Sequence, residues 1–266
     1  MKEKITNIFS RINTLIKIKK RKPTVVVKEK RHRFAWLEKH NWIVTLFLVF
    51  FLSVILAASL RGMPGNPTIA QFNTISWKDQ GPLELSPERG RFALLYSIAE
   101  QHSFTFSPDV ARFVAPDVGY KDGVYGSLFS PTVSFLVIPG YLLGKLVGLS
   151  QVGTYAMVAF FALLNVFLIR AVAIRLGANP LAGLIAGMTF LFASPAFAYA
   201  VTLYQHHIST FIILLSIYLL IRFNSWWSLL SIWTLFALSF SVDYPNLFLM
   251  LPIALTAFGK SFMVEK

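Results

Sequence analysis

A carboxylate and a guanidinium stand one helical turn apart in the segment SPERGRF, residues 86–92. Residues three apart share one face of a helix, so Glu88 and Arg91 are predicted to point the same way. Ser86 is predicted to be the N-cap, with Pro87 at the first helical position and Glu88 in the first turn, where the helix dipole stabilises its anion. Such a carboxylate can deprotonate a hydroxyl group, and the nearby arginine can meet a phosphate. Ordinary helix-start chemistry gives the same pattern without any function.

A second polar group lies between two apolar runs, in AYAVTLYQHHISTF, residues 198–211. Imidazole is costly inside hydrocarbon, so Tyr204, His206 and His207 are expected at the mouth of a membrane rather than at its centre. These three residues are either interfacial side chains or part of a substrate-binding site. Their position beside a large loop rich in carboxylates favours a site.

Further candidates for substrate binding are Arg89, which follows Glu88, and the acids Asp117 and Asp122, which flank a glycine, a tyrosine and a lysine in a predicted turn. Each acid can also serve only its own turn by accepting hydrogen bonds from local amides. The sequence has no metal-ligand spacing, no phosphate-binding loop and no nucleophile elbow. We therefore predict no cofactor and assign no metal ligands. A divalent cation held by Glu88 or Asp117 together with a histidine stays open.

The composition indicates a membrane protein. Hydrophobic residues make up 55% of the chain and charged residues 14%, with a mean hydropathy of +0.60. Several apolar runs approach the roughly 20 residues that cross a bilayer. The chain has no cysteine, which excludes disulfides and thiolate chemistry.

Most of the net charge of +13 lies in residues 1–40, where thirteen lysines and arginines stand against three glutamates. Isoleucine, leucine and phenylalanine recur there at helical spacing, which predicts a basic amphipathic helix. This arm is either a cytoplasmic tail that sets the orientation of the chain or a helix lying on anionic lipid. Nucleic-acid binding is not predicted.

We predict an all-α, polytopic helix bundle in the cell membrane, with a cytoplasmic amino terminus, a first span at residues 41–60 and an extracytoplasmic loop at residues 61–150 that contains interfacial helices. Five further spans are expected in residues 151–266, at 152–176, 181–198, 208–222, 226–242 and 247–259. Residues 130–150 are also apolar but are interrupted by proline, glycine and lysine. Placing them along the outer interface leaves Arg170, Arg175, Arg222 and Lys260 cytoplasmic, as the positive-inside rule prefers.

The order of the spans, the outer loop and their short motifs is similar to that of the GT-C superfamily of membrane glycosyltransferases, especially lipid A aminoarabinose transferases and protein O-mannosyltransferases. The segments that carry the resemblance are ERGRF (88–92), SLFSPTVSF (127–135), FLVIPGYLLGKLVG (135–148), IRLGANPLAGLIAG (174–187) and SPAFAYAVTLYQHHISTF (194–211). The resemblance implies transfer of a sugar from a polyprenyl-phosphate donor to an acceptor outside the cytoplasm. It marks Glu88 as the catalytic acid of the family pattern, Arg91 as its arginine and His206 as the polar residue that opens the fourth span.

The sequence departs from the family pattern at Phe129, which stands where the family often has lysine. The predicted six spans are also fewer than the family has, so we expect either a continuing chain or a partner subunit. Two rival interpretations stay open: a non-catalytic membrane scaffold of the same fold, and a transporter. No acid lies within any predicted span, although coupled carriers usually keep ionisable groups there, and this argues against a transporter.

Overall fold

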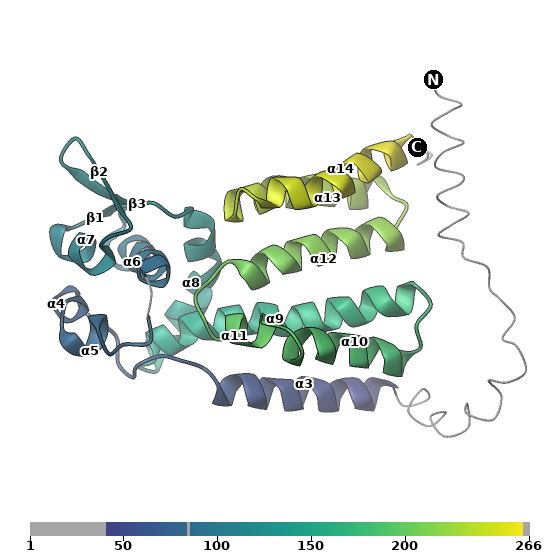
Figure 1. The fold of residues 1–266 in the computed structure, drawn as a ribbon, viewed down its shortest axis with the longest axis horizontal. Coiled ribbons are helices and arrows are strands. Elements are labelled where there is room, and N and C mark those ends of the chain that lie inside the picture. Colours follow the sequence, from purple (N-terminus) through teal and green to yellow (C-terminus); the bar gives the residue numbers. More distant parts are fainter. Residues whose placement is uncertain (1–40, 84–85, 263–266) are drawn as a thin grey trace, which may run out of the picture.

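The computed structural model describes residues 41–83 and 86–262, so the basic arm predicted for residues 1–40 lies outside the described part. The described chain is mostly helical, which confirms the coarse prediction of fold class, with twelve helices and three short strands. Figure 1 shows two parts: a long helix bundle that contains both ends of the described chain, and a smaller unit at one end of it. We call this smaller part the outer unit.

Helices that alternate in direction build the bundle, because short connections join most neighbours. Its members are α3 (Asn41–Ala58), α9 (Ser150–Arg175), α10 (Pro180–Phe192), α11 (Ala196–Ala200), α12 (His206–Arg222), α13 (Trp226–Val242) and α14 (Asn246–Ser261). One apolar core lies among α3, α9 and α10, and a second lies among α12, α13 and α14. The Arg170 side chain on α9 donates from Nη1 to Thr45 Oγ1 on α3 at 3.0 Å and ties the first helix to the bundle.

Local signals set the helix ends at the bundle end that is remote from the outer unit. The Asn179 side chain caps α10 by accepting from the Ala182 amide at 2.7 Å, with Pro180 in the first turn. The carboxyl ends of α9, α12 and α14 lie at this same end (Figure 1). Arg175, Arg222 and Lys260, each in the last turn of its helix, therefore gather at one end of the bundle.

Only α9, within the described residues, is long and apolar enough to pass as a membrane span by itself, and six other apolar helices are shorter. The predicted span at residues 181–198 is not one helix: α10 ends at Phe192, and the short α11 begins at Ala196. Pro195 explains the break, because a proline disfavours helical geometry in the residue before it. The polytopic arrangement therefore remains a proposal.

Helix α8 (Pro131–Leu146) lies between the bundle and the outer unit and runs across the bundle end (Figure 1). At its start, the Ser130 hydroxyl donates to the backbone carbonyl of Ser241, which is at the end of α13. Near its other end, Gly140 and Gly144 pack against Gly153 at the start of α9. A Cβ at Gly153 would lie 2.1 Å from the Gly140 carbonyl oxygen, so only glycine allows this approach. Its position along a membrane interface stays a prediction.

The outer unit contains helices and also a small sheet. The sequence patterns did not predict the sheet. The elements of the outer unit are α4 (Ile69–Phe72), α5 (Ile75–Lys78), α6 (Ser86–Gln101), β1 (Thr105–Phe106), α7 (Pro108–Val114), β2 (Val118–Lys121) and β3 (Val124–Ser127). The strands are antiparallel in the order β1-β3-β2, and residues 122–123 form the turn between β2 and β3. Both turn residues have positive φ, 51° for Asp122 and 84° for Gly123, which is the backbone of a tight Asp-Gly hairpin.

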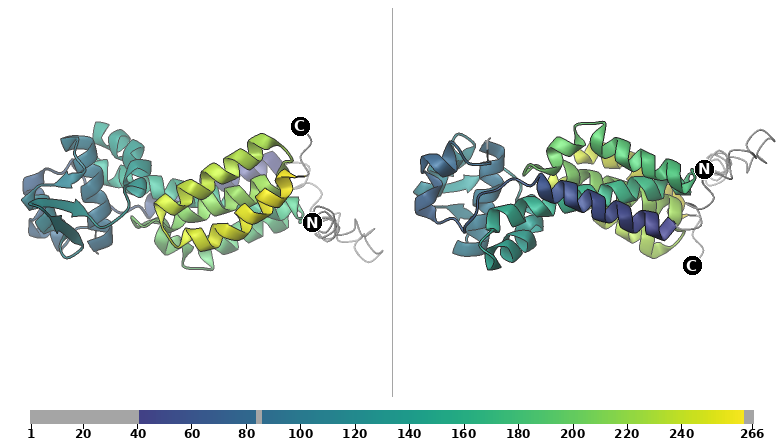
Figure 2. Two further views of the ribbon diagram at one scale, coloured as in Figure 1. Left: turned by 90° about the horizontal axis from the view of Figure 1, so that it is seen from above. Right: turned by 90° about the horizontal axis from the view of Figure 1, so that it is seen from below.

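Helix α6 is the centre of the outer unit rather than a helix on its surface. Phe92, Leu95 and Tyr96 are buried, and Phe72 packs its ring 4.8 Å from Tyr96 and 6.2 Å from Phe92. The apolar side chains of α6 thus form the core of this unit. Figure 2 shows that the unit continues the long axis of the bundle.

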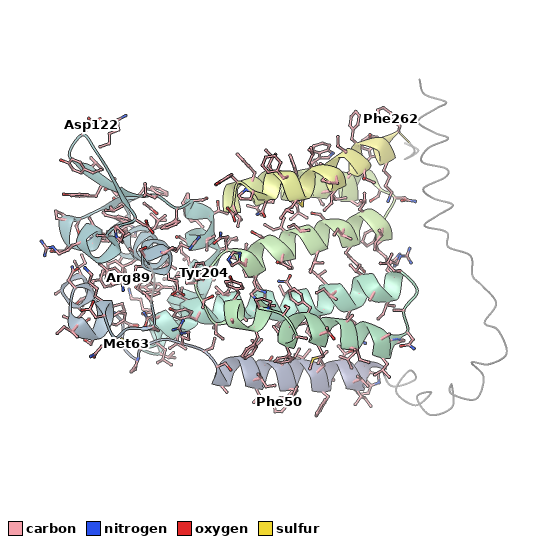
Figure 3. All side chains as sticks on the ribbon, viewed as in Figure 1. Phe50, Met63, Arg89, Asp122, Tyr204 and Phe262 are labelled. Atoms are coloured by element: carbon pink, nitrogen blue, oxygen red, sulfur yellow. The ribbon has the colours of Figure 1, made fainter. Side chains whose placement is uncertain are left out.

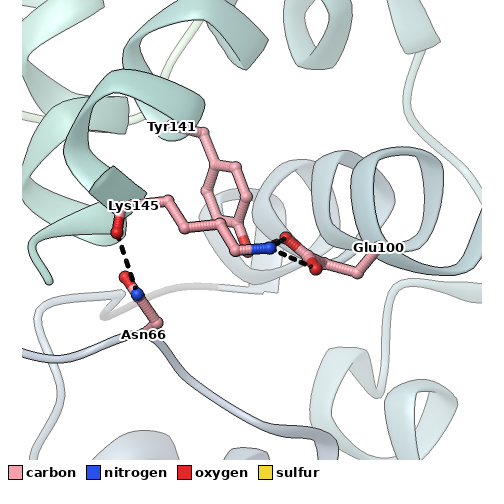
Figure 4. Close-up of polar contacts among 4 residues, drawn as sticks. All are labelled: Asn66, Glu100, Tyr141 and Lys145. Carbon is pink, nitrogen blue, oxygen red and sulfur yellow. Dashed lines mark hydrogen bonds and ion pairs between the residues drawn. The ribbon is translucent and has the colours of Figure 1, made fainter. Parts of the chain in front are cut away.

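A polar cluster joins the end of α6 to α8 (Figure 4). The Lys145 ammonium contacts both carboxylate oxygens of Glu100 at 2.7 Å, and the Tyr141 hydroxyl donates to the same carboxylate at 2.9 Å. Partial burial opposes ionisation of Glu100, but the hydrogen bonds from Lys145 and Tyr141 outweigh it and hold the pKa of this carboxyl below its ordinary value. The Asn66 side chain donates to the Lys145 carbonyl at 3.1 Å and holds the preceding loop against α8.

Candidate functional site

The first two turns of α6 carry Glu88 and Arg91 to the junction between the outer unit and the bundle. Glu88 is only 1% exposed, and its Oε1 accepts a hydrogen bond of 2.9 Å from the Leu203 amide. Leu203 lies in the segment that connects α11 to α12, so Glu88 holds this segment against the outer unit. Ser86 is the first residue of α6 rather than its N-cap, and its hydroxyl donates to Asp117 Oδ2 at 2.6 Å.

Arg91 is 6% exposed and lies on two aromatic rings. Its guanidinium carbon is 4.8 Å from the Phe129 ring centroid and 5.6 Å from that of Tyr204, which is the geometry of cation–π contacts. Burial lowers the pKa of Arg91, and the neighbouring acidic groups of Tyr204, Asp243 and Glu88 oppose this shift. Phe129, which stands where the resemblance leads one to expect a lysine, therefore lies directly beside a different cation.

The Arg91 hydrogen bonds lead to a residue that was not among the sequence candidates. Nη1 donates to the Pro87 carbonyl at 3.2 Å, and Nη2 donates to Gln205 Oε1 at 2.5 Å. Gln205 in turn donates from Nε2 to Asp243 Oδ2 at 2.9 Å. The side chains of α6, the α11–α12 segment and the α13–α14 turn thus form one chain of hydrogen bonds, from a guanidinium through an amide to a carboxylate.

Aromatic rings form the rim beside this chain. The His206 ring is exposed, lies 4.3 Å from the Tyr199 ring and stacks at 5.7 Å on Tyr204. A pocket of about 260 Å³ opens next to His206 and is also lined by Tyr199, Ser194 and Thr210. Tyr204 and His206, both predicted from sequence, therefore contact one another, and the Tyr204 ring also contacts Arg91.

His207 lies inside the bundle, although the sequence pattern placed it with His206 at the mouth. Its side chain is 2% exposed, and Nε2 lies 2.7 Å from the Ala196 carbonyl. Since a carbonyl only accepts, Nε2 carries the proton, and Nδ1 is left to accept from the Asn165 amide nitrogen at 3.2 Å. His207 fixes the α11 turn against α9 and α12, and it does not reach Arg91 through any of these bonds.

The structure does not bring the other predicted residues to Arg91. Arg89 points to α5, where Nη2 donates to the Lys78 carbonyl at 2.7 Å and Nε donates to the Leu83 carbonyl at 3.1 Å. Asp117 accepts from Ser86, so it anchors the start of α6. Asp122 is exposed at the tip of the β2–β3 hairpin, on the far side of the outer unit from Tyr204 (Figure 3).

No group of three histidine, aspartate or glutamate side chains stands together in residues 41–83 and 86–262 as a metal-binding cluster would. The site brings together an arginine on aromatic rings, two carboxylates and a histidine. Comparisons with models of known protein families, with curated proteins and with solved structures returned no match to this chain.

Proposed function

We propose that this chain is an integral membrane glycosyltransferase that takes a sugar from a polyprenyl-phosphate donor and transfers it to an acceptor on the outer face of the membrane. The observation that carries the proposal is the meeting of Arg91, Gln205 and Asp243, from three separate elements, beside the exposed ring of His206. A cation and a carboxylate at one end of an apolar bundle suit a reaction in which a phosphate leaves and a hydroxyl attacks.

We also propose that the bundle spans the membrane, and this placement suits the reaction. The proposed spans are α3, α9, α10, α12, α13 and α14, and together they present a largely apolar outer surface: Phe50, Phe160, Phe240 and Leu249 are each about half exposed or more. Side chains of this kind are stable in contact with lipid. The basic ends of α9, α12 and α14 face the cytoplasm in this arrangement, and the site faces the opposite compartment together with the outer unit.

Arg91 would hold the departing phosphate. Its two hydrogen bonds use two of the five N–H donors of a guanidinium and leave three for an anion. Phe129 and Tyr204 hold the guanidinium plane in a fixed orientation, and this limits the conformational entropy lost when a donor binds. The donor must displace part of the rim, because Arg91 is almost fully covered.

The experiment is a transfer assay with the purified chain in nanodiscs, with polyprenyl-phosphate-linked glucose, mannose or aminoarabinose as donor and a membrane extract as source of acceptors. The readout is the release of free polyprenyl phosphate. We expect release with one of these donors and a loss of roughly 100-fold in Arg91→Ala, the usual scale when a charge-stabilising donor is removed. Arg112→Ala is the matched control, because this exposed arginine forms its ion pair with Asp109 on its own helix, at 3.5 Å.

One observation favours the non-catalytic scaffold instead. Glu88, which the family resemblance marks as the catalytic acid, is buried and already holds the Leu203 amide. A wild-type chain that releases no polyprenyl phosphate from any of the three donors, while it melts cooperatively, would favour the scaffold.

A further inference from the structure

The backbone around Asp243 is fixed by two helices. Its amide donates to the Ser239 carbonyl at the end of α13, at 3.1 Å, and its carbonyl accepts from the Asn246 amide at the start of α14, at 3.0 Å. The side chain is half-buried, at the same bundle end as Tyr204 and His206. The position of this carboxylate is therefore set by the scaffold rather than by a loop.

Gln205 can be oriented in only one way between its two partners. A guanidinium can only donate and an ionised carboxylate can only accept, so the amide oxygen must face Arg91 and the amide nitrogen must face Asp243. Oδ2 of Asp243 is thereby held, whereas Oδ1 accepts no hydrogen bond from any residue that the structure describes. One oxygen is anchored, and the other is left to accept a proton.

The two carboxylates of the site differ in access. Glu88 is 1% exposed and is committed to Leu203, so an acceptor hydroxyl could reach it only after the α11–α12 segment moved away. Asp243 is half-buried and is joined to Arg91 through Gln205. A general base must come within about 3 Å of the proton that it removes, and this condition is more easily met at Asp243.

We propose that Asp243 is the general base of the transfer reaction and that Glu88 is a positioning residue. This assignment rests on the proposed function. The acceptor hydroxyl gives its proton to Oδ1 of Asp243, and its oxygen forms a bond to the anomeric carbon of the sugar. The bond between that carbon and the phosphate oxygen breaks, and the oxygen keeps the electron pair. The polyprenyl phosphate leaves as an anion beside Arg91.

The test is the kinetics of Asp243→Asn in the nanodisc assay with the donor that the wild type uses. Asparagine keeps the size of the side chain and an oxygen that can accept from Gln205, but it cannot take the proton. We expect kcat to fall roughly 100-fold or more, with the KM for the donor within about threefold of the wild type. Asp243→Glu should recover part of the lost rate. Asp109→Asn, an identical change on the exposed surface of α7, is the matched control.

A parallel variant, Glu88→Gln, separates the two carboxylates. Its amide oxygen can still accept from Leu203, so we expect a smaller loss of rate than in Asp243→Asn, about tenfold or less, and a lower melting temperature. The assignment is overturned if Asp243→Asn keeps more than about a tenth of the wild-type rate, or if its defect lies entirely in the KM for the donor. Either result leaves the proposed function intact, because the wild type still transfers sugar. An inactive wild type would instead contradict both the proposed function and the assignment of Asp243 as the base.

Discussion

The close approach of α8 and α9 makes a quantitative prediction for Gly153→Ala. A new Cβ at this position would lie 2.1 Å from the Gly140 carbonyl oxygen and 3.0 Å from the Gly144 Cα. Carbon and oxygen normally stay about 3.3 Å apart even in favourable contacts, so α8 and α9 would have to separate by about 1 Å. Both of these neighbours are backbone atoms, and a change of rotamer cannot relieve the overlap.

The expected cost follows from packing. Overpacking of this kind costs typically about 1–3 kcal/mol, and a backbone overlap belongs at the upper end of that range. A gap of up to about 1 Å around buried neighbours such as Tyr141 and Tyr155 also removes roughly a quarter to a half of their dispersion contacts. The better helix propensity of alanine offsets about 1 kcal/mol of this loss of stability. The net loss is about 2 kcal/mol, equivalent to a melting temperature about 4–8 °C lower for a chain of this size.

The assay is thermal unfolding of the purified protein in one detergent, with Gly126→Ala as control. A Cβ added at Gly126 would meet no atom within 4 Å, and this glycine has no positive φ, so the same change should leave the melting temperature unaltered or slightly raise it. Transfer activity should fall in Gly153→Ala as well, because the Ser134 hydroxyl on α8 donates to the Arg91 carbonyl at 2.9 Å. A Gly153→Ala protein that melts at or above the wild-type temperature would show that the two helices are not in this contact.

Three other predictions concern ion pairs, the site and topology. Lys145→Met should lower stability at neutral pH by about 0.2–1 kcal/mol. The pKa of Glu100 is lower in the folded protein, so the stability that the ion pair adds is present above the unfolded pKa of about 4.3 and is lost as the pH falls through the folded value. The melting curves of the wild type and of Lys145→Met should therefore converge at acid pH. A difference that stays constant with pH would contradict the pairing. Gln205→Leu leaves a buried Arg91 donor unpaired and should cost about 1–3 kcal/mol in thermal unfolding, whereas an unchanged curve would mean that the Gln205 bonds add nothing. The sequence has no cysteine, so single cysteines can be introduced and labelled selectively. A cysteine in place of Asp122 should react with an impermeant maleimide added outside intact cells, and a cysteine in place of Asn179 should not. The reverse labelling pattern would show that the topology is the opposite of the proposed one.

Strong apolar runs with clear caps were predictable from the sequence. Helix α13 spans the predicted residues 226–242, with the Ser225 hydroxyl accepting from the Ser228 amide as its cap, and α12 begins two residues before the predicted start. The break between α10 and α11 was missed by the predicted span at residues 181–198, but it could have been predicted because Ser194-Pro195 interrupts the run. The Asp-Gly pair between alternating residues is a strong hairpin signal that could have predicted β2 and β3.

The site was only partly predictable, for physical reasons. Glu88 and Arg91 do come to one junction, as helical spacing requires, while Arg89 faces α5 because adjacent residues of a helix point in different directions. Gln205 and Asp243 are 38 residues apart, and no local pattern links an amide and a carboxylate at that distance along the chain. Their meeting depends on how α12 and α13 pack. The family resemblance implies a catalytic role for Glu88, whereas the burial of Glu88 and its bond to Leu203 led us to propose Asp243 as the base.

The length of α10 has a consequence for the surrounding lipid. At about 1.5 Å per residue its 13 residues rise only about 20 Å, roughly 10 Å less than the hydrocarbon thickness of a typical bilayer. In the proposed membrane placement, such a mismatch is relieved by local thinning of the bilayer on this side of the bundle. The outer headgroups would then sink toward Ser194 and Tyr199, at the opening of the pocket beside His206. A lipid phosphate could thus reach the depth of the site by deformation of the leaflet, without first being extracted from it.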